Sequence, residues 1–324
     1  MQMSVAFALI ALAGAAPLTG QVSPSPSEAP PPPPASTDLS IGLDIDSGRM
    51  TVPVSIGASG PYKFVIDTGA ERSVISRELA TSLALTAGKP VRLIGLAGTA
   101  TVETVHVPEL SISTLGARNV EAPALATGNI GARGMLGIDA LQGHRIMIDF
   151  DRRAMKVTPS GRRIRSASAP GDILVSAKNL YGQLIVTDAR YHGERISVII
   201  DTGSPISIGN LAMLNLARRS AKSLGAISVT SVTGQKLDTS YVMINDLHIA
   251  GIEFDHVPMA VADVPPFKRF GLEDSPALIL GMDTMRLFRR VNIDFANRQI
   301  LFSLPAPRMA TRGCSAGTSC SSYN

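Results

Sequence analysis

The hydrophobic positions along most of the chain fall into short runs of apolar and β-branched residues, each bounded by glycine, proline or polar residues. Clear examples are Met50–Ile56, Lys63–Ile66 and Ile196–Ile200. Runs of this length and composition predict β-strands, whereas the longer periodicity of amphipathic helices is scarce. The pattern therefore predicts a mainly β fold.

Short helices are expected at only a few places. The segments that favour them are Ser76–Leu83, Asn210–Arg218, Asp139–Gln142 and Asp283–Leu287. Asp139 and Asp283 begin the last two segments, where an aspartate side chain can accept a hydrogen bond from a free backbone N–H group. We therefore expect these two aspartates to be N-caps.

The chain also repeats itself. Phe64–Ala70 reads FVIDTGA and Val198–Ser204 reads VIIDTGS, which places Asp67 and Asp201 134 residues apart. Further matching segments follow in the same order: Leu93–Thr101 with Val229–Leu237, Glu109–Ile112 with Asp246–Ile249, Met135–Asp139 with Ile279–Asp283, and Ile148–Phe150 with Ile293–Phe295. An ordered repeat of this kind predicts two copies of one structural unit.

The repeat and the local composition divide the chain. Two homologous lobes are expected at 40–157 and 172–305, and the polar, basic segment 158–171, rich in Gly, Pro and Ser, is expected to be an exposed linker. The proline-rich segment 21–39 predicts a disordered or polyproline II spacer, and 306–324 is expected to be a C-terminal tail.

An apolar run near the start, Val5–Ala16, ends in small residues. It is shorter than the roughly 20 apolar residues that a membrane span needs, and it is similar to the apolar region of a secretory signal peptide. No Lys or Arg precedes it, and a buried N-terminal strand or a misassigned start is the alternative. The interpretation as a signal peptide within 1–20 predicts a periplasmic or secreted protein with no stable membrane span.

Composition narrows the classes of partner. Among 324 residues the formal net charge is only +4, there is no Trp, and aromatic residues make up 4%. So mild a charge and so few stacking side chains argue against a nucleic-acid partner. The chain has no phosphate loop and no dinucleotide fingerprint, so no cofactor is expected.

The residues that commonly bind metals are sparse. The two cysteines, Cys314 and Cys320, cannot form a four-ligand zinc site by themselves, and none of the five histidines forms a close pair such as His-x-x-x-His. We therefore expect no metal site. Export would permit a disulfide between Cys314 and Cys320, and two free thiols are the alternative.

The two Asp-Thr-Gly segments carry the most chemistry. An apolar run that leads into Asp-Thr-Gly predicts a strand ending in a tight turn, with the carboxylate at its tip. Glycine permits close backbone approach, and backbone N–H groups can donate to the carboxylate. The hydroxyl groups of Thr68 and Thr202 can bridge to the other copy.

On these motifs the chain resembles the aspartic proteases, in particular the bacterial retropepsin-like branch with two fused repeats, over about residues 40–305. The family motif of two apolar residues followed by Asp-Thr-Gly-Ala/Ser is matched at Val65–Ala70 and Ile199–Ser204. The family's second element, two apolar residues and Gly, is matched at Met135–Gly137 and Leu278–Gly281. The resemblance implies two pseudo-twofold-related β-barrel lobes that enclose one cleft.

The resemblance also implies residue roles. Asp67 and Asp201 would hold one proton and one water between them, with Thr68, Gly69, Thr202, Gly203 and Ser204 in support, and would hydrolyse peptide bonds without a metal or cofactor. Leu136, Gly137, Leu280 and Gly281 would pin the two turns, and Gly98 and Gly234 would lie at the tips of two flaps. We further expect the Ser204 hydroxyl to donate to Asp201 and to favour its charged form.

Two questions stay open at the level of sequence. The same fold without catalysis would be a module that binds an extended peptide by strand addition. Each repeat could also pair with a repeat of another chain, although the linker is long enough for internal pairing. We expect a monomer with an intramolecular pseudo-dimer and an extended polypeptide as its substrate.

Overall fold

The computed structural model describes residues 39–305 except 43, 47–48, 113–114, 166 and 168. The expected signal peptide, nearly all of the proline-rich spacer, and the tail with Cys314 and Cys320 lie outside the described residues. Within the described part of the chain, no helix is long and apolar enough to cross a membrane.

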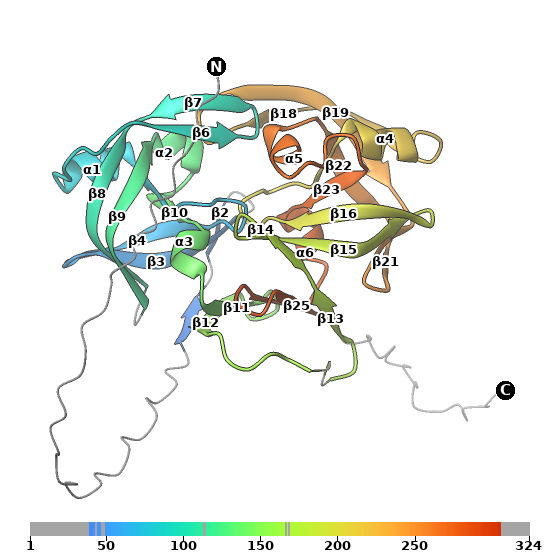
Figure 1. Ribbon diagram of the computed structural model, residues 1–324, viewed down its shortest axis with the longest axis horizontal. Helices are drawn as coiled ribbons and strands as arrows, with labels where there is room; N and C mark the ends of the chain where they lie inside the picture. The colour runs from blue at the N-terminus through green and yellow to red at the C-terminus, as the bar shows by residue number, and fades with distance from the viewer. Residues whose placement is uncertain are drawn as a thin grey trace, which may run out of the picture. The chain divides into compact units, whose positions relative to one another are not determined.

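The first half of the chain forms a seven-stranded sheet (Figure 1). Its order is β2 (Asp44–Asp46), β3 (Arg49–Ile56), β4 (Ser59–Ile66), β10 (Gly134–Leu136), β5 (Val74–Ser76), β9 (Leu115–Leu125) and β8 (Thr104–Ile112). An additional pairing of β3 with β8 closes six of these strands into a barrel, namely β3, β4, β10, β5, β9 and β8. Strand β10 lies between β4 and β5, parallel to β4 and antiparallel to β5.

The second half of the chain repeats this arrangement of three central strands within a ten-stranded sheet. Its order is β18 (Lys222–Thr230), β19 (Lys236–Ile244), β22 (Val257–Val261), β17 (Ile208–Gly209), β23 (Ala277–Leu280), β16 (Glu194–Ile200), β15 (Gln183–Tyr191), β20 (Leu247–Ile249) and β21 (Ile252–Phe254), with β14 (Lys178–Leu180) paired to β15. Strand β23 is parallel to β16 and antiparallel to β17, as β10 is to β4 and β5. The predicted mainly β fold with two homologous lobes is confirmed.

The buried apolar side chains of the strands form the core. In β3, Met50, Val52 and Val54 are at most 1% exposed, whereas Pro53 between them is exposed. Strands β3, β4 and β16 contain the three apolar runs from which strands were predicted, and these predictions are confirmed. Burial of such side chains is the main favourable contribution to folding.

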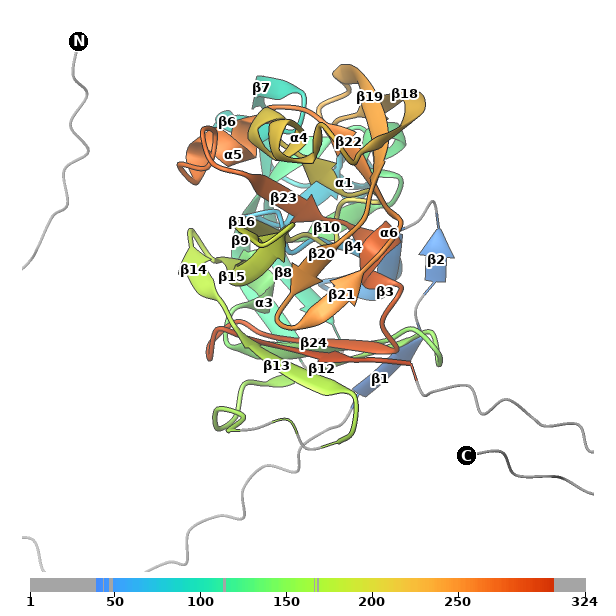
Figure 2. The same cartoon turned by 90° about the vertical axis from the view of Figure 1, so that its right-hand side faces the viewer.

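A third sheet is shared by both halves, and Figure 2 shows it below the rest of the fold. Its order is β1 (Leu39–Gly42), β12 (Ala154–Pro159), β11 (His144–Asp149), β24 (Arg290–Asp294), β25 (Gln299–Ser303) and β13 (Asp172–Ser176). The antiparallel pair β11–β24 joins the two halves at the centre of this sheet.

Two reciprocal ion pairs cross the β11–β24 junction. Arg145 from the first half lies 2.7 Å from Asp294, and Arg290 from the second half lies 2.8 Å from Asp149. Burial would raise the pKa of both carboxyls, but hydrogen bonds to them, including those from these arginines, hold both pKa values below the usual range. The matching Ile-Asp-Phe segments therefore bind the halves to each other.

The predicted helices form, with one correction. They are α1 (Arg77–Ser82), α4 (Leu211–Ala217), α3 (Ile138–Leu141) and α6 (Met282–Met285), to which the structure adds α2 (Thr127–Ile130) and α5 (Pro265–Arg269). The prediction that Asp139 and Asp283 are N-caps is wrong, because Gly137 and Gly281 occupy those positions. The two aspartates lie inside the first turn, and their carboxylates accept hydrogen bonds from distant serines as well as from the N–H group of the next residue.

We predict that Arg145→Gln destabilises the protein, because Asp294 is left with 1% side-chain exposure and without its cation. The loss in unfolding free energy should be about 2 kcal/mol in urea denaturation at pH 7. The control Arg118→Gln, which removes an exposed pair with Glu109 at 3.9 Å, should change it by less than about 0.5 kcal/mol. Equal stability of Arg145→Gln and the wild type would contradict a structural role for the pair.

Candidate active site

Each Asp-Thr-Gly turn is fixed at the end of a central strand. Asp67 follows β4, and its N–H group donates to the carbonyl oxygen of Leu136 at 3.0 Å. Asp201 follows β16 in the same way, and its N–H group donates to the carbonyl oxygen of Leu280 at 3.1 Å. The two apolar-apolar-Gly segments thus position the first residue of each turn.

The glycines of those segments are required by close packing. A Cβ atom on Gly137 would collide with the backbone of Arg72, and one on Gly281 would collide with the backbone of Ile206. Both glycines have extended backbone and begin helices α3 and α6, so space rather than conformation selects glycine here. Any larger residue would push the segment away from the aspartate turn.

A hydrogen-bond relay supports each turn from behind. The Gly137 N–H group donates to Ser73 Oγ at 3.1 Å, and that hydroxyl donates to Asp139 at 2.7 Å. In the second lobe the Gly281 N–H group donates to Ser207 Oγ at 3.1 Å, and that hydroxyl donates to Asp283 at 2.7 Å. Sequence reasoning missed both serines, although each stands six residues after its aspartate.

Thr68 and Thr202 interlock across the junction of the lobes. The Thr68 N–H group donates to Thr202 Oγ1 at 3.1 Å, and the Thr202 N–H group donates to Thr68 Oγ1 at 3.0 Å. Each hydroxyl in turn donates to the carbonyl oxygen at the end of the opposite strand, Ile200 at 2.9 Å and Ile66 at 2.8 Å. Both threonines are at most 3% exposed, so these bonds are protected from water. The bridge predicted from the sequence is confirmed.

The interlock places the two carboxyl groups against each other's turns. A Cβ atom on Gly69 would lie 2.6 Å from Asp201 Cγ, and one on Gly203 would collide with the Asp67 carboxyl. The N–H groups of Gly69 and Gly203 donate to their own aspartates at 2.9 Å and 2.8 Å. Glycine at both positions is therefore a steric requirement of one shared acidic site.

Burial and proximity perturb the titration of the pair. Burial, together with the neighbouring Asp201 charge, raises the pKa of Asp67 to about 8. Burial also raises the pKa of Asp201, but the N–H groups of Gly203 and Ser204 and the Asp67 carboxyl donate to it and oppose that rise. Both shifts have the same direction, so the pair holds a proton more tightly than a free carboxyl does, and that proton belongs to the pair rather than to either residue.

The expectation for the Ser204 hydroxyl is wrong. The hydroxyl donates to the carbonyl oxygen of Ile206 at 2.7 Å, within the same turn, and the backbone N–H group of Ser204 faces Asp201 at 3.3 Å instead. Serine side chains commonly bond to nearby backbone in turns, and here that bond removes the hydroxyl from the carboxylate. The difference between Ala70 and Ser204 therefore does not act through a hydroxyl bond to the aspartate.

Two hairpins lie where flaps were expected (Figure 1). In the first, β6 (Val91–Gly95) pairs with β7 (Gly98–Val102), and Gly98, with φ of 137°, begins the returning strand. In the second, β18 pairs with β19, and Gly234 lies in the turn with φ of 85°. The tips of the two hairpins are in contact: Gly95 ends β6, Ser231 follows β18, and a Cβ atom on Gly95 would lie 2.5 Å from Ser231 Oγ.

A cavity of about 650 Å³ lies between the carboxyl pair and the hairpins. Asp67 and Asp201 line it together with residues of both hairpins, among them Leu93, Leu96 and Val229. A space of this size takes a short length of peptide or a small molecule. Its lining comes from both lobes, so the site exists only when they are joined.

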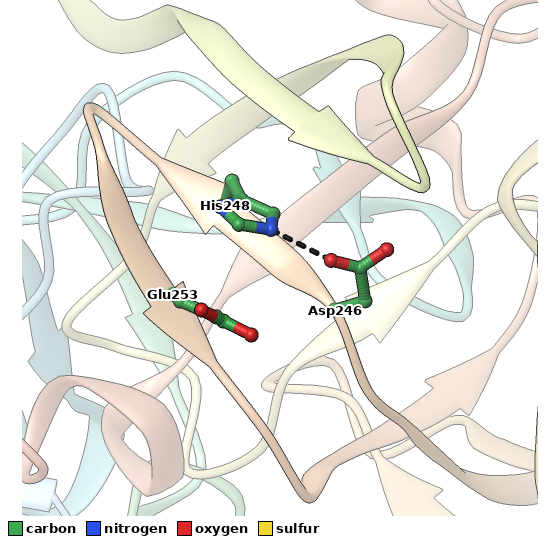
Figure 3. Close-up of side chains that lie close together, drawn as sticks. All are labelled: Asp246, His248 and Glu253. Carbon is green, nitrogen blue, oxygen red and sulfur yellow. Dashed lines mark hydrogen bonds and ion pairs between the residues drawn. The ribbon is translucent and has the colours of Figure 1, made fainter.

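A second group of polar side chains lies on the second lobe, outside this cavity. Asp246, His248 and Glu253 each offer one atom that could bind a metal ion, and these atoms lie within 4.8 Å of one another (Figure 3). The expectation of no metal site rested on the absence of close histidine pairs, and the spacing Asp246-x-His248 is not such a pair.

Comparison with known proteins agrees with the repeat. A family model described as "Aspartyl protease" matches residues 52–140 and 187–284, so it covers more than half of the chain and matches once in each lobe. Each matched region contains one Asp-Thr-Gly turn and its apolar-apolar-Gly segment. A search of curated proteins found no match to this chain.

We predict that Thr202→Val destabilises the junction of the lobes. Valine keeps the shape of threonine but removes the acceptor of the Thr68 N–H group and the donor to Ile66, which leaves two buried polar groups without partners. The unfolding free energy should fall by about 3 kcal/mol in urea denaturation. Thr202→Ser, which keeps the hydroxyl, is the control and should lose much less. If both variants lost the same amount, packing rather than hydrogen bonding would hold the lobes together.

Proposed function

Because the chain belongs to the aspartyl protease family, we propose that it is an exported aspartic endopeptidase that uses Asp67 and Asp201 as one catalytic pair. The observation that carries this proposal is the mutual burial of the two carboxyl groups, each packed on the glycine of the other's turn. Two carboxyls held so closely share one proton, which supplies a general base and a general acid at the same pH.

The chemistry follows from that proton. The ionised Asp201 takes a proton from a water molecule, whose oxygen attacks the carbonyl carbon of the scissile peptide bond. Asp67 donates its proton to the carbonyl oxygen, so that the tetrahedral intermediate carries no full negative charge. When the intermediate collapses, the C–N bond breaks and the nitrogen takes the proton that Asp201 received. One hydroxyl of the intermediate returns its proton to Asp67, which restores the starting state of the pair. The products are a new carboxyl group and a new amine.

The substrate is a polypeptide in extended conformation. The hairpins β6–β7 and β18–β19 present strands above the carboxyl pair, and an extended chain can hydrogen-bond to such strands through its own backbone. The cavity below is lined by apolar side chains of both lobes, among them Met135, Ile199 and Ile279. The same cleft without catalysis would be a peptide-binding module, which is the alternative that the activity test addresses.

The organisation of the chain follows the same proposal. We assign the lobes to 40–157 and 172–305, the linker to 158–171, a signal peptide to 1–20 and a spacer to 21–39, so that the enzyme acts in the periplasm or outside the cell. The Thr68–Thr202 interlock joins the repeats within one chain, which supports a monomer with an intramolecular pseudo-dimer. The proposal includes no nucleic-acid partner and no cofactor.

We predict that Asp67→Asn and Asp201→Asn each abolish cleavage of an unfolded protein substrate, with kcat reduced by about a thousand-fold or more. Either change removes one of the two groups between which the proton moves. Asp151→Asn, which changes an exposed carboxyl in the same way, is the control and should retain wild-type activity. If the wild-type protein binds unfolded peptides but cuts none of them, the proposal of an enzyme fails and the peptide-binding module takes its place.

The pH dependence should reveal the shared proton. Because the pKa of Asp67 is raised to about 8, the pair keeps its proton below that pH and loses it as the pH rises through about 8. We therefore predict that kcat/KM falls on the alkaline side near pH 8, and falls again in acid when the second carboxyl is protonated. Activity that kept increasing above pH 8 would be inconsistent with a protonated Asp67.

A further inference from the structure

The charged side chains that line the cavity, apart from the aspartate pair, are distributed unevenly between the lobes. The first lobe contributes Arg49, Glu71, Arg72 and Arg92, and the second lobe contributes Arg269. Four arginines thus face one glutamate around a peptide-sized space. A cleft with an excess of one charge concentrates ligands of the opposite charge.

One arginine is already neutralised. Arg269 Nε lies 2.6 Å from Glu71 Oε1, and this pair connects α5 of the second lobe to the turn that follows Asp67. The Arg269 guanidinium also lies 4.2 Å from the centre of the Tyr181 ring. Both residues of the pair line the cavity, so the pair adds no net charge to it.

The remaining three arginines all belong to the first lobe. Burial raises the pKa of both aspartates, and the charge of Arg49 partly opposes that rise, so its field acts on the pair itself. Hydrogen bonds from the Lys89 N–H group and the Thr104 hydroxyl lower the pKa of Glu121, and Arg72 adds only a smaller charge effect. In the described part of the chain, no carboxylate forms an ion pair with Arg72 or Arg92.

The wall from the second lobe has a different character. Apart from Asp201 and the paired Arg269, it carries no charged residue in the described part of the chain. Its apolar lining residues include Ile199, Ile206, Ile227, Val229, Phe270 and Ile279. A peptide that crosses the carboxyl pair therefore meets guanidinium groups among apolar side chains on one side, and an uncharged, largely apolar surface on the other.

From this asymmetry we propose that the cleft selects polypeptides with acidic side chains on one side of the scissile bond and apolar side chains on the other. Arg72 and Arg92 are the specificity-determining residues of the acidic side. This inference rests on the proposed function, because it names the substrate class of the same cleft. Guanidinium groups suit this task, since they stay charged at every relevant pH and can hold carboxylates with two hydrogen bonds.

The test uses matched peptides that carry two glutamates or two glutamines on one chosen side of a common apolar cleavage site. Each exposed arginine–carboxylate pair should change kcat/KM about threefold, so the glutamate peptide should be preferred about tenfold on one of the two sides. The preference should shrink at high salt, which screens exposed charges. In Arg72→Gln/Arg92→Gln the ratio of glutamate to glutamine peptide should fall toward one.

A charge-matched variant separates the cleft from the whole protein. Arg118→Gln/Arg219→Gln removes two exposed arginines that do not line the cavity, and the preference should stay as in the wild type. Equal kcat/KM for glutamate and glutamine peptides on both sides would overturn the inference while leaving the protease intact. An equal loss of the glutamate preference in the two double variants would also overturn the inference.

Binding gives an answer that does not depend on catalysis. Fluorescence anisotropy with Asp201→Asn protein measures the affinities of the same labelled peptides, and the glutamate peptide should again bind about tenfold more tightly. If no peptide is cut but this preference is present, the proposed enzyme fails and the inferred ligand class survives. If peptides are cut but bind with equal affinity, only the inference fails.

An independent observation concerns the group of side chains in Figure 3, at the hairpin β20–β21. Leu247 and Ile249 are fully buried, and alternation turns His248 outward, directly opposite Glu253 in the strand register. Asp246 stands two residues before His248 and shares its face of the hairpin. The cluster is therefore a product of strand geometry.

A chain of hydrogen bonds orients the central carboxylate. Asp246 Oδ1 lies 2.6 Å from His248 Nε2, and Asp246 Oδ2 lies 2.6 Å from His192 Nδ1. The other nitrogen of His192 is 3.0 Å from Ser220 Oγ, and that hydroxyl is 2.7 Å from the hydroxyl of buried Tyr191. Metal ligands are commonly held by such outer hydrogen bonds.

We propose that Asp246, His248 and Glu253 bind a zinc-class divalent cation, with His192 as a positioning residue. One imidazole nitrogen and two carboxylate oxygens are donors that zinc accepts, and a water molecule would complete the four ligands. Arg190 is the register partner of His248, but its guanidinium donates to the Gly193 carbonyl oxygen at 2.7 Å. The side chains need to adjust by about an ångström from their present contacts to surround an ion.

Isothermal titration of the full chain with Zn²⁺ tests this site. We expect binding in the micromolar range, weakened at least about tenfold in His248→Ala and in Glu253→Gln. The control His106→Ala removes an exposed histidine of the first lobe and should bind as the wild type does. Absence of binding at 100 µM Zn²⁺, or equal binding by the wild type and His248→Ala, would overturn the proposal.

Discussion

The interlock of Thr68 and Thr202 is the interaction on which the site depends. Each hydroxyl accepts from the opposite N–H group and donates to the opposite strand, so four buried hydrogen bonds fix two turns that are 134 residues apart. Because Asp67 and Asp201 directly precede these threonines, the interlock sets the separation of the carboxyl groups. Burial raises the pKa of both aspartates, and the nearby charge of Asp201 raises the pKa of Asp67 further.

Other parts of the fold protect this arrangement. The relays from Gly137 through Ser73 and from Gly281 through Ser207 hold each turn against its own lobe. Below them, the Arg145–Asp294 pair crosses the shared sheet and joins the halves a second time. Thus the sequence repeat corresponds to a pseudo-twofold in the structure, because each element that positions one aspartate has a counterpart that positions the other.

Sequence alone predicted what local patterns encode. Short apolar runs predicted the strands, and the spacing of the two Asp-Thr-Gly segments predicted the pair and its threonine bridge. The roles of Asp139 and Asp283 were mistaken, because a position at a helix start suggests a cap whereas the carboxylates reach serines more than 60 residues away. The concentration of arginines on one wall of the cavity likewise depends on tertiary contacts, which no local pattern encodes.

The central claim is that the two repeats form one catalytic site, and the activity of a double variant tests it most directly. The effects of substitutions at residues that act as one unit are not additive. The double variant Asp67→Asn/Asp201→Asn should therefore lose no more activity than either single variant, which is about a thousand-fold. The measurement is kcat on one unfolded substrate for the wild type, both single variants and the double variant. Losses that multiply in the double variant, or substantial activity in either single one, would contradict a shared site.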